Sequence, residues 1–121
     1  MQHAAKAYGT VAQQTASPRD LEAQLLLRAA SRLQNVHDHW DCERGTLDHA
    51  LLFNRKLWTI FLTSVTSTDN PLPAEVRQNI ANIGIFVMNQ TLTVMGNPQP
   101  ERLRSLIHIN RQLAAGLSGN A

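Results

Sequence analysis

Histidine, aspartate and cysteine side chains gather in one short stretch of this chain, and they are the residues best suited to chemistry. The stretch contains His37, His39, Asp41, Cys42 and His49. Imidazole, carboxylate and thiolate groups are the usual protein ligands of zinc and other transition metals. His37 and His39 are only two positions apart at a predicted helix end, so their side chains point in different directions, and no His-x-x-x-His or Cys-x-x-Cys pair is present. We therefore expect a polar turn between two helices here, and no bound metal.

Neither covalent catalysis nor cofactor chemistry finds support elsewhere in the sequence. Cys42 is the only cysteine and has no recognisable activating partner, while a lone cysteine excludes an internal disulfide and is typical of a reducing compartment. The glycines are isolated, so no Gly-rich loop could hold a phosphate group. We expect a protein that is not an enzyme and that takes no cofactor and no small-molecule substrate.

Length and charge point to one soluble domain. The 121 residues, with a net charge of +2, suit a single domain spanning residues 1–121. The basic residues are scattered, and the pair Arg55 and Lys56 is the only local candidate for nucleic-acid binding, which a solvated helix edge explains more simply. No apolar stretch is long enough to span a membrane and no signal peptide is recognisable at the start, so we expect a cytoplasmic protein.

Apolar residues recur at spacings of three and four, which predicts an all-α fold. We expect a single-domain bundle of four main helices plus a short N-terminal helix, at about 3–11, 17–40, 46–65, 71–95 and 101–117. Ser17 suits the N-cap of the second of these helices, Pro18 its first position, and Thr46 the N-cap of the third. The helix at 46–65 is apolar on two sides, so it should pair with the next helix at the middle of the bundle, with the last helix docked outside.

The helix at 71–95 carries no charged side chain after Arg77, which is typical of a helix that is covered on nearly every side. At about 100° per residue, its apolar residues form two faces on roughly opposite sides. The first face consists of Val76, Ile80, Ile83, Val87 and Val94, and the second of Ile85, Met88, Leu92 and Met95. Two apolar faces need two packing partners, so we expect this helix to be central. The predicted core between the two middle helices consists of Trp58, Ile80, Ile83 and Val87.

Amide and hydroxyl side chains form a stripe between these two faces. Such groups suit either hydrogen bonds between helices or recognition of a peptide backbone, without the cost of burying charge. We expect the second face and the amides at its edge to bind a partner; the predicted site is Gln78, Asn82, Ile85, Met88, Asn89, Leu92 and Met95. The short N-terminal helix around Tyr8 would shield this surface when no partner is bound. The next candidate surface consists of Leu52, Lys56 and Thr59.

Four segments carry a family resemblance. They are YGTVAQQTASPRDLEAQLLLRAA (8–30), LLFNRKLWTIF (51–61), DNPLPAEVRQNIANIGIFVMNQT (69–91) and LIHINRQLAAGL (106–117). These segments resemble the flagellar biosynthesis regulator FlaF family of alphaproteobacteria, over nearly the whole chain. The resemblance implies a small helical cytoplasmic protein that supports flagellin production and filament assembly, working against FlbT, a companion regulator that restrains flagellin translation. It also implies direct binding of flagellin, as by a secretion chaperone.

The residues and the resemblance both favour a binding protein. A bundle with apolar helices can accept an amphipathic partner helix in a groove, and flagellin termini are such helices. The alternative is a post-transcriptional regulator of flagellin translation that acts through RNA or FlbT without binding flagellin. Contact with RNA would have to use Arg55, Lys56 and Arg77. The stretch at 37–42 matches no motif with a family role.

Overall fold

The computed structural model describes residues 17–119, which are helical apart from the connections between helices. The elements are α2 (Pro18–Asp38), α3 (Trp40–Glu43), η1 (Arg44–Thr46), α4 (Leu47–Thr66), α5 (Ala74–Gly96), η2 (Pro100–Leu103) and α6 (Arg104–Leu117). No strand occurs within these residues, so the predicted all-α bundle of four main helices is confirmed. The short helix predicted at 3–11 lies outside the described residues.

Local sequence explains where α2 begins, but the predicted cap of α4 is absent. Ser17 Oγ accepts a hydrogen bond from the Asp20 amide at 3.0 Å, and Pro18 occupies the first turn of α2, as predicted. Thr46 precedes α4 but does not cap it, which corrects the prediction. Its backbone already belongs to the η1 turn, so its hydroxyl points backwards and donates to the Glu43 carbonyl at 2.7 Å.

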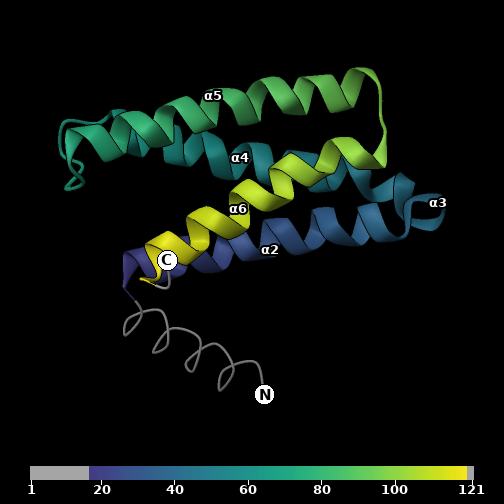
Figure 1. Cartoon of the computed structure of the whole chain (residues 1–121), viewed down its shortest axis with the longest axis horizontal. Coiled ribbons are helices and arrows are strands. Elements are labelled where there is room, and N and C mark those ends of the chain that lie inside the picture. Colours follow the sequence, from purple (N-terminus) through teal and green to yellow (C-terminus); the bar gives the residue numbers. More distant parts are fainter. Residues whose placement is uncertain (1–16, 120–121) are drawn as a thin grey trace, which may run out of the picture.

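The four long helices pack as two pairs. α2 lies along α6, α5 lies along α4, and α2 and α4 join the pairs. Figure 1 shows α5 and α2 at opposite edges of the bundle, with α6 running diagonally between them to end beside the start of α2. The largest side chains that are fully buried between these helices are Trp58, Leu26, Leu33, Leu103 and Leu106.

The predicted central position of the helix at 71–95 is wrong. α4 lies between α5 and α2, whereas α5 packs against α4 and touches η2 near its own end. Trp58, Ile80 and Val87 are buried as predicted. Ile83, however, is 37% exposed and Val76 is 40% exposed, because only one narrow face of α5 meets another helix within residues 17–119.

α6 belongs to the core rather than to the outside of the bundle, which corrects a second prediction. Its Asn110 is completely buried. Asn110 Oδ1 accepts a hydrogen bond from Trp58 Nε1 at 2.9 Å, and Asn110 Nδ2 donates to Asn54 Oδ1 at 2.6 Å. A buried polar network therefore ties α6 to α4, in addition to the apolar packing of α6 on α2.

Candidate partner-binding surface

The apolar residues predicted to bind a partner lie on a flank of α5 that is largely open. Ile85, Leu92 and Met95 are 56%, 62% and 51% exposed, whereas Met88 is half-buried and packs against the core. Their spacing along the helix places the four side chains in one continuous line, which we call the α5 ridge. The ridge lies beside the buried face of α5 and not opposite it as predicted, and this is why Met88 reaches the core.

The α5 ridge leads into a hollow where α4 meets α5. This seam hollow has a volume of about 240 Å³ and is lined by Asp48, Leu51, Leu52, Arg55, Thr91 and Met95. A second hollow of about 460 Å³, the α4 hollow, is lined by Leu52, Arg55, Lys56, Thr59 and Ile60. Leu52 and Arg55 line both hollows, so the α5 ridge and the second candidate surface form one continuous surface. Helical periodicity could not predict this continuity, because it does not tell which flank of α4 lies beside α5.

The three predicted amides lie on the outermost side of α5. Gln78, Asn82 and Asn89 are all exposed. Gln78 Nε2 donates to Asn82 Oδ1 at 3.0 Å, one turn along the same helix. The backbone carbonyl of Asn89 accepts from the Thr93 hydroxyl at 3.1 Å. Among the described residues, none of these amides forms a hydrogen bond to another helix. They therefore remain open to a partner along the edge of the ridge.

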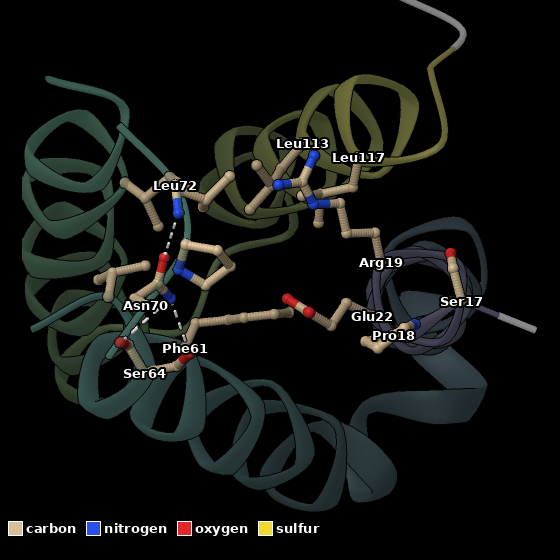
Figure 2. A pocket seen from close by; sticks show the side chains of 13 residues that line it. Ser17, Pro18, Arg19, Glu22, Phe61, Ser64, Asn70, Leu72, Leu113 and Leu117 are labelled. Carbon is tan, nitrogen blue, oxygen red and sulfur yellow. Dashed lines mark hydrogen bonds between the residues drawn. The ribbon is translucent and has the colours of Figure 1, made fainter. Parts of the chain in front are cut away.

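A separate cavity opens at the end of the bundle where the described chain starts. This terminal cavity has a volume of about 460 Å³, and its walls come from the start of α2, the end of α4, the loop before α5 and the end of α6. Figure 2 shows Glu22 pointing into it toward Phe61, with Leu113 and Leu117 on another wall. The cavity was not predicted, because its walls are distant in sequence and no motif links them.

Among the described residues, Glu22 is the one carboxylate that lines the terminal cavity. Partial burial raises its pKa, and the positive charge of Arg19 opposes this with a smaller lowering effect. Carboxyl groups with raised pKa are common in active sites. Between residues 17 and 119, the lining of the cavity contains no second acid, no histidine and no cysteine with which Glu22 could share proton transfer. We assign no reaction to this cavity.

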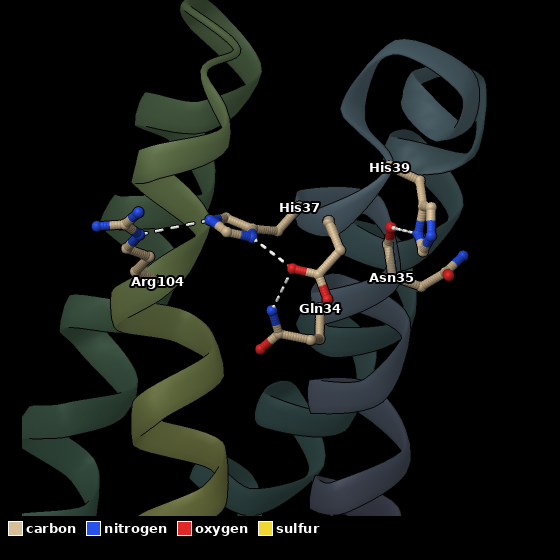
Figure 3. Close-up of polar contacts among 6 residues, drawn as sticks. Gln34, Asn35, His37, His39 and Arg104 are labelled. Carbon is tan, nitrogen blue, oxygen red and sulfur yellow. Dashed lines mark hydrogen bonds and ion pairs between the residues drawn. The ribbon is translucent and has the colours of Figure 1, made fainter.

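The histidine stretch forms polar contacts at the end of α2 (Figure 3). His37 Nδ1 lies 2.9 Å from Asp38 Oδ1, which also accepts from Gln34 Nε2 at 2.8 Å. Both hydrogen bonds lower the pKa of the Asp38 carboxyl, and the bond with His37 has the larger effect. Arg104 Nε of α6 approaches His37 Nε2 at 3.4 Å, so His37 helps to join α2 to α6.

The two neighbouring histidines contact different groups. His39 Nδ1 lies 3.1 Å from the Asn35 carbonyl, on another side of the helix end from His37 (Figure 3). Within residues 17–119, no three His, Cys, Asp or Glu side chains are placed to hold a metal ion. Cys42 is exposed with a free thiol. Tyr8, which was predicted to shield the binding surface, lies outside the described residues.

Comparison with known proteins assigns the chain to a family. In the described part of the chain, no helix combines the length and the apolar character that crossing a membrane requires. Searches of curated proteins and of solved structures found no match. The family model for the flagellar protein FlaF matches residues 4–117, a range that includes every helix described above. The chain therefore belongs to the FlaF family of flagellar proteins.

Proposed function

We propose that this protein binds flagellin and acts as its secretion chaperone in the cytoplasm, and thereby supports flagellin synthesis and flagellum assembly. An amphipathic helix of flagellin would lie along the α5 ridge and into the seam hollow. Membership of the FlaF family supports a flagellar role, and the shape and chemistry of this surface support a helical partner.

One observation carries the proposal: α5 presents exposed apolar side chains along a stretch that has no charged residue after Arg77. Leu92 and Met95 are 62% and 51% exposed, and Leu52 of α4, which lines the same hollow as Met95, is 44% exposed. Contiguous apolar patches that are rimmed by polar groups mark interaction sites on soluble proteins. Here the rim is supplied by amides, which can pair with a partner without losing charge solvation. The flexible Met88 and Met95 side chains can adapt to several flagellin variants.

Leu92→Asp tests this proposal. Leu92 is largely exposed, so the change should spare the fold, whereas Met88 packs partly on the core and its replacement would confuse folding with binding. A carboxylate at the centre of the contact would be desolvated and unpaired, so affinity for flagellin should fall by at least about tenfold. Isothermal titration with purified flagellin measures the affinity, and circular dichroism of the same sample measures helix content.

Leu27→Asp is the matched control. Leu27 is 48% exposed on α2, so the same chemical change is made on a different face of the bundle. This variant should bind flagellin as the wild type does. If Leu92→Asp stays folded and binds flagellin with unchanged affinity, the α5 ridge is not the binding surface.

The alternative is regulation of flagellin translation through RNA or FlbT. Of the three basic residues that RNA would require, Arg77 is already engaged within the fold. Its Nε and Nη1 donate to the Leu72 and Ser67 carbonyls at 3.2 and 3.3 Å. Arg55 and Lys56 remain, on α4. Binding to RNA would weaken steeply as salt concentration rises, whereas binding of an apolar helix would change little. Wild-type protein that retains RNA or FlbT but no flagellin would favour this alternative.

A further inference from the structure

The charged groups at the proposed binding surface come from α4 alone. α5 has no Asp, Glu, Lys or Arg after Arg77, and Arg77 is held by backbone carbonyls at the far end of the helix from the seam hollow. On α4, Asp48 and Arg55 line the seam hollow, and Arg55 and Lys56 line the α4 hollow. One edge of the surface is therefore charged and the other carries only amides.

The charges on this edge have no partners within residues 17–119. The one contact of ion-pair type among these residues joins His37 and Asp38, both on α2, and involves neither Asp48, Arg55 nor Lys56. Arg55 and Lys56 therefore lack a carboxylate at contact distance. Asp48 lies in the first turn of α4, where the helix dipole stabilises a negative charge without any basic side chain.

The order of these charges gives the edge a direction. Asp48 and Arg55 are seven positions apart in α4, so they lie on the same flank, about 10 Å apart along the helix axis. Leu52 lies between them on the floor shared by both hollows. A helix that lies along the seam would thus meet a negative group at one point and two positive groups about two turns further along.

We infer that the bound helix carries a basic side chain and, about two turns away on the same edge, an acidic one, so that charge along α4 fixes the direction in which the helix lies. This inference rests on the proposed function. In one direction the acidic group faces Arg55 and Lys56 and the basic group faces Asp48. In the reverse direction like charges meet at both points, which disfavours that arrangement. The apolar ridge supplies contact area but no direction, because its side chains are chemically alike.

Charge reversal in the intact protein tests the inference. The double variant Arg55→Glu, Lys56→Glu should weaken flagellin binding by roughly tenfold at low salt, because it replaces two attractive contacts by repulsive ones. High salt should narrow this difference through screening. The matched control is Arg28→Glu, Arg111→Glu, which makes the same change in net charge at exposed positions of α2 and α6 and should leave affinity close to that of the wild type.

Asp48→Lys separates a directional pattern from simple attraction of an acidic partner. The inferred pattern places a basic group opposite Asp48, so this variant should also bind more weakly. Tighter binding of Asp48→Lys, or equal weakening by the Arg55, Lys56 double variant and by its control, would overturn the inference. If the wild type does not bind flagellin, the proposed function is wrong, and the inference that rests on it falls too. This outcome is distinct from failure of the inference alone, because it is seen with the wild type and needs no variant.

Discussion

A chain of three side chains, Trp58, Asn110 and Asn54, is the main polar feature of the core. All three are completely buried, and they connect α4 with α6 through hydrogen bonds of 2.9 and 2.6 Å. Asn54 Nδ2 has no hydrogen-bond partner among the described residues. Asn110 occupies the middle of the chain, where it accepts from one neighbour and donates to the other. Removing its amide would leave two buried polar groups unsatisfied.

We predict that Asn110→Ala lowers the free energy of unfolding by about 2–5 kcal/mol, since the Trp58 indole N–H and the Asn54 carbonyl lose their partners and a small cavity remains. Urea unfolding followed by tryptophan fluorescence measures this. Asn89→Ala, at an exposed position of α5, is the control and should stay within about 0.5 kcal/mol of the wild type. A small effect of Asn110→Ala would mean that the network contributes little to stability.

α5 shows which features of a helix can be predicted from sequence and which cannot. Its existence, approximate ends and buried residues Ile80 and Val87 follow from periodicity and from the preceding prolines. The exposure of Ile83 does not, because apolar side chains at helical spacing look alike whether a neighbour covers them or solvent does. The α5 ridge was predicted as an interaction surface from its lack of charge, but its continuity with Leu52 depends on how α4 and α5 pair. Pairing is a tertiary property that a single sequence does not encode in its periodicity.

The helices α4 and α5 approach each other closely at Gly84. A Cβ added to Gly84 would lie 2.5 Å from Leu62 Cδ2 and 2.9 Å from Leu62 Cγ, closer than carbon atoms approach. Glycine in a helix costs about 1 kcal/mol relative to alanine, so its presence here is explained by packing and not by helix propensity. Leu62 is half-buried, and the space above Gly84 is filled by its side chain.

We predict strong coupling between Gly84→Ala and Leu62→Ala. In the wild-type background, the clash with Leu62 should offset or exceed the gain in helix propensity. In the Leu62→Ala background the clash is gone, so Gly84→Ala should become stabilising by up to about 1 kcal/mol. A double-mutant cycle from chemical denaturation measures the coupling, which should be about 1 kcal/mol. Additive effects would show that the two helices do not meet at this point.

At the scale of the whole molecule, packing is unevenly distributed. α2, α4 and α6 surround the buried tryptophan and share most of the core, while α5 is fastened along one face to α4. An element held on one side, with exposed apolar residues on both flanks of its contact, opens more easily than elements that are enclosed. The surface proposed to bind flagellin thus lies largely on the least enclosed long helix, where a partner adds the packing that α5 otherwise lacks.

We therefore predict that the amides of α5 exchange hydrogen roughly tenfold faster or more than those at the centres of α2 and α4, because α5 can open without exposing the whole core. Hydrogen exchange measured by mass spectrometry resolves the helices. Addition of flagellin should slow exchange in α5 most, since the bound helix covers its ridge and opening then requires dissociation. The Leu92→Asp variant is the control, and the same addition should leave its α5 exchange nearly unchanged. Equal protection of α5 and α4 in the free protein would show that the contact along one face is sufficient to hold α5, and that its exposed ridge is not a sign of missing packing.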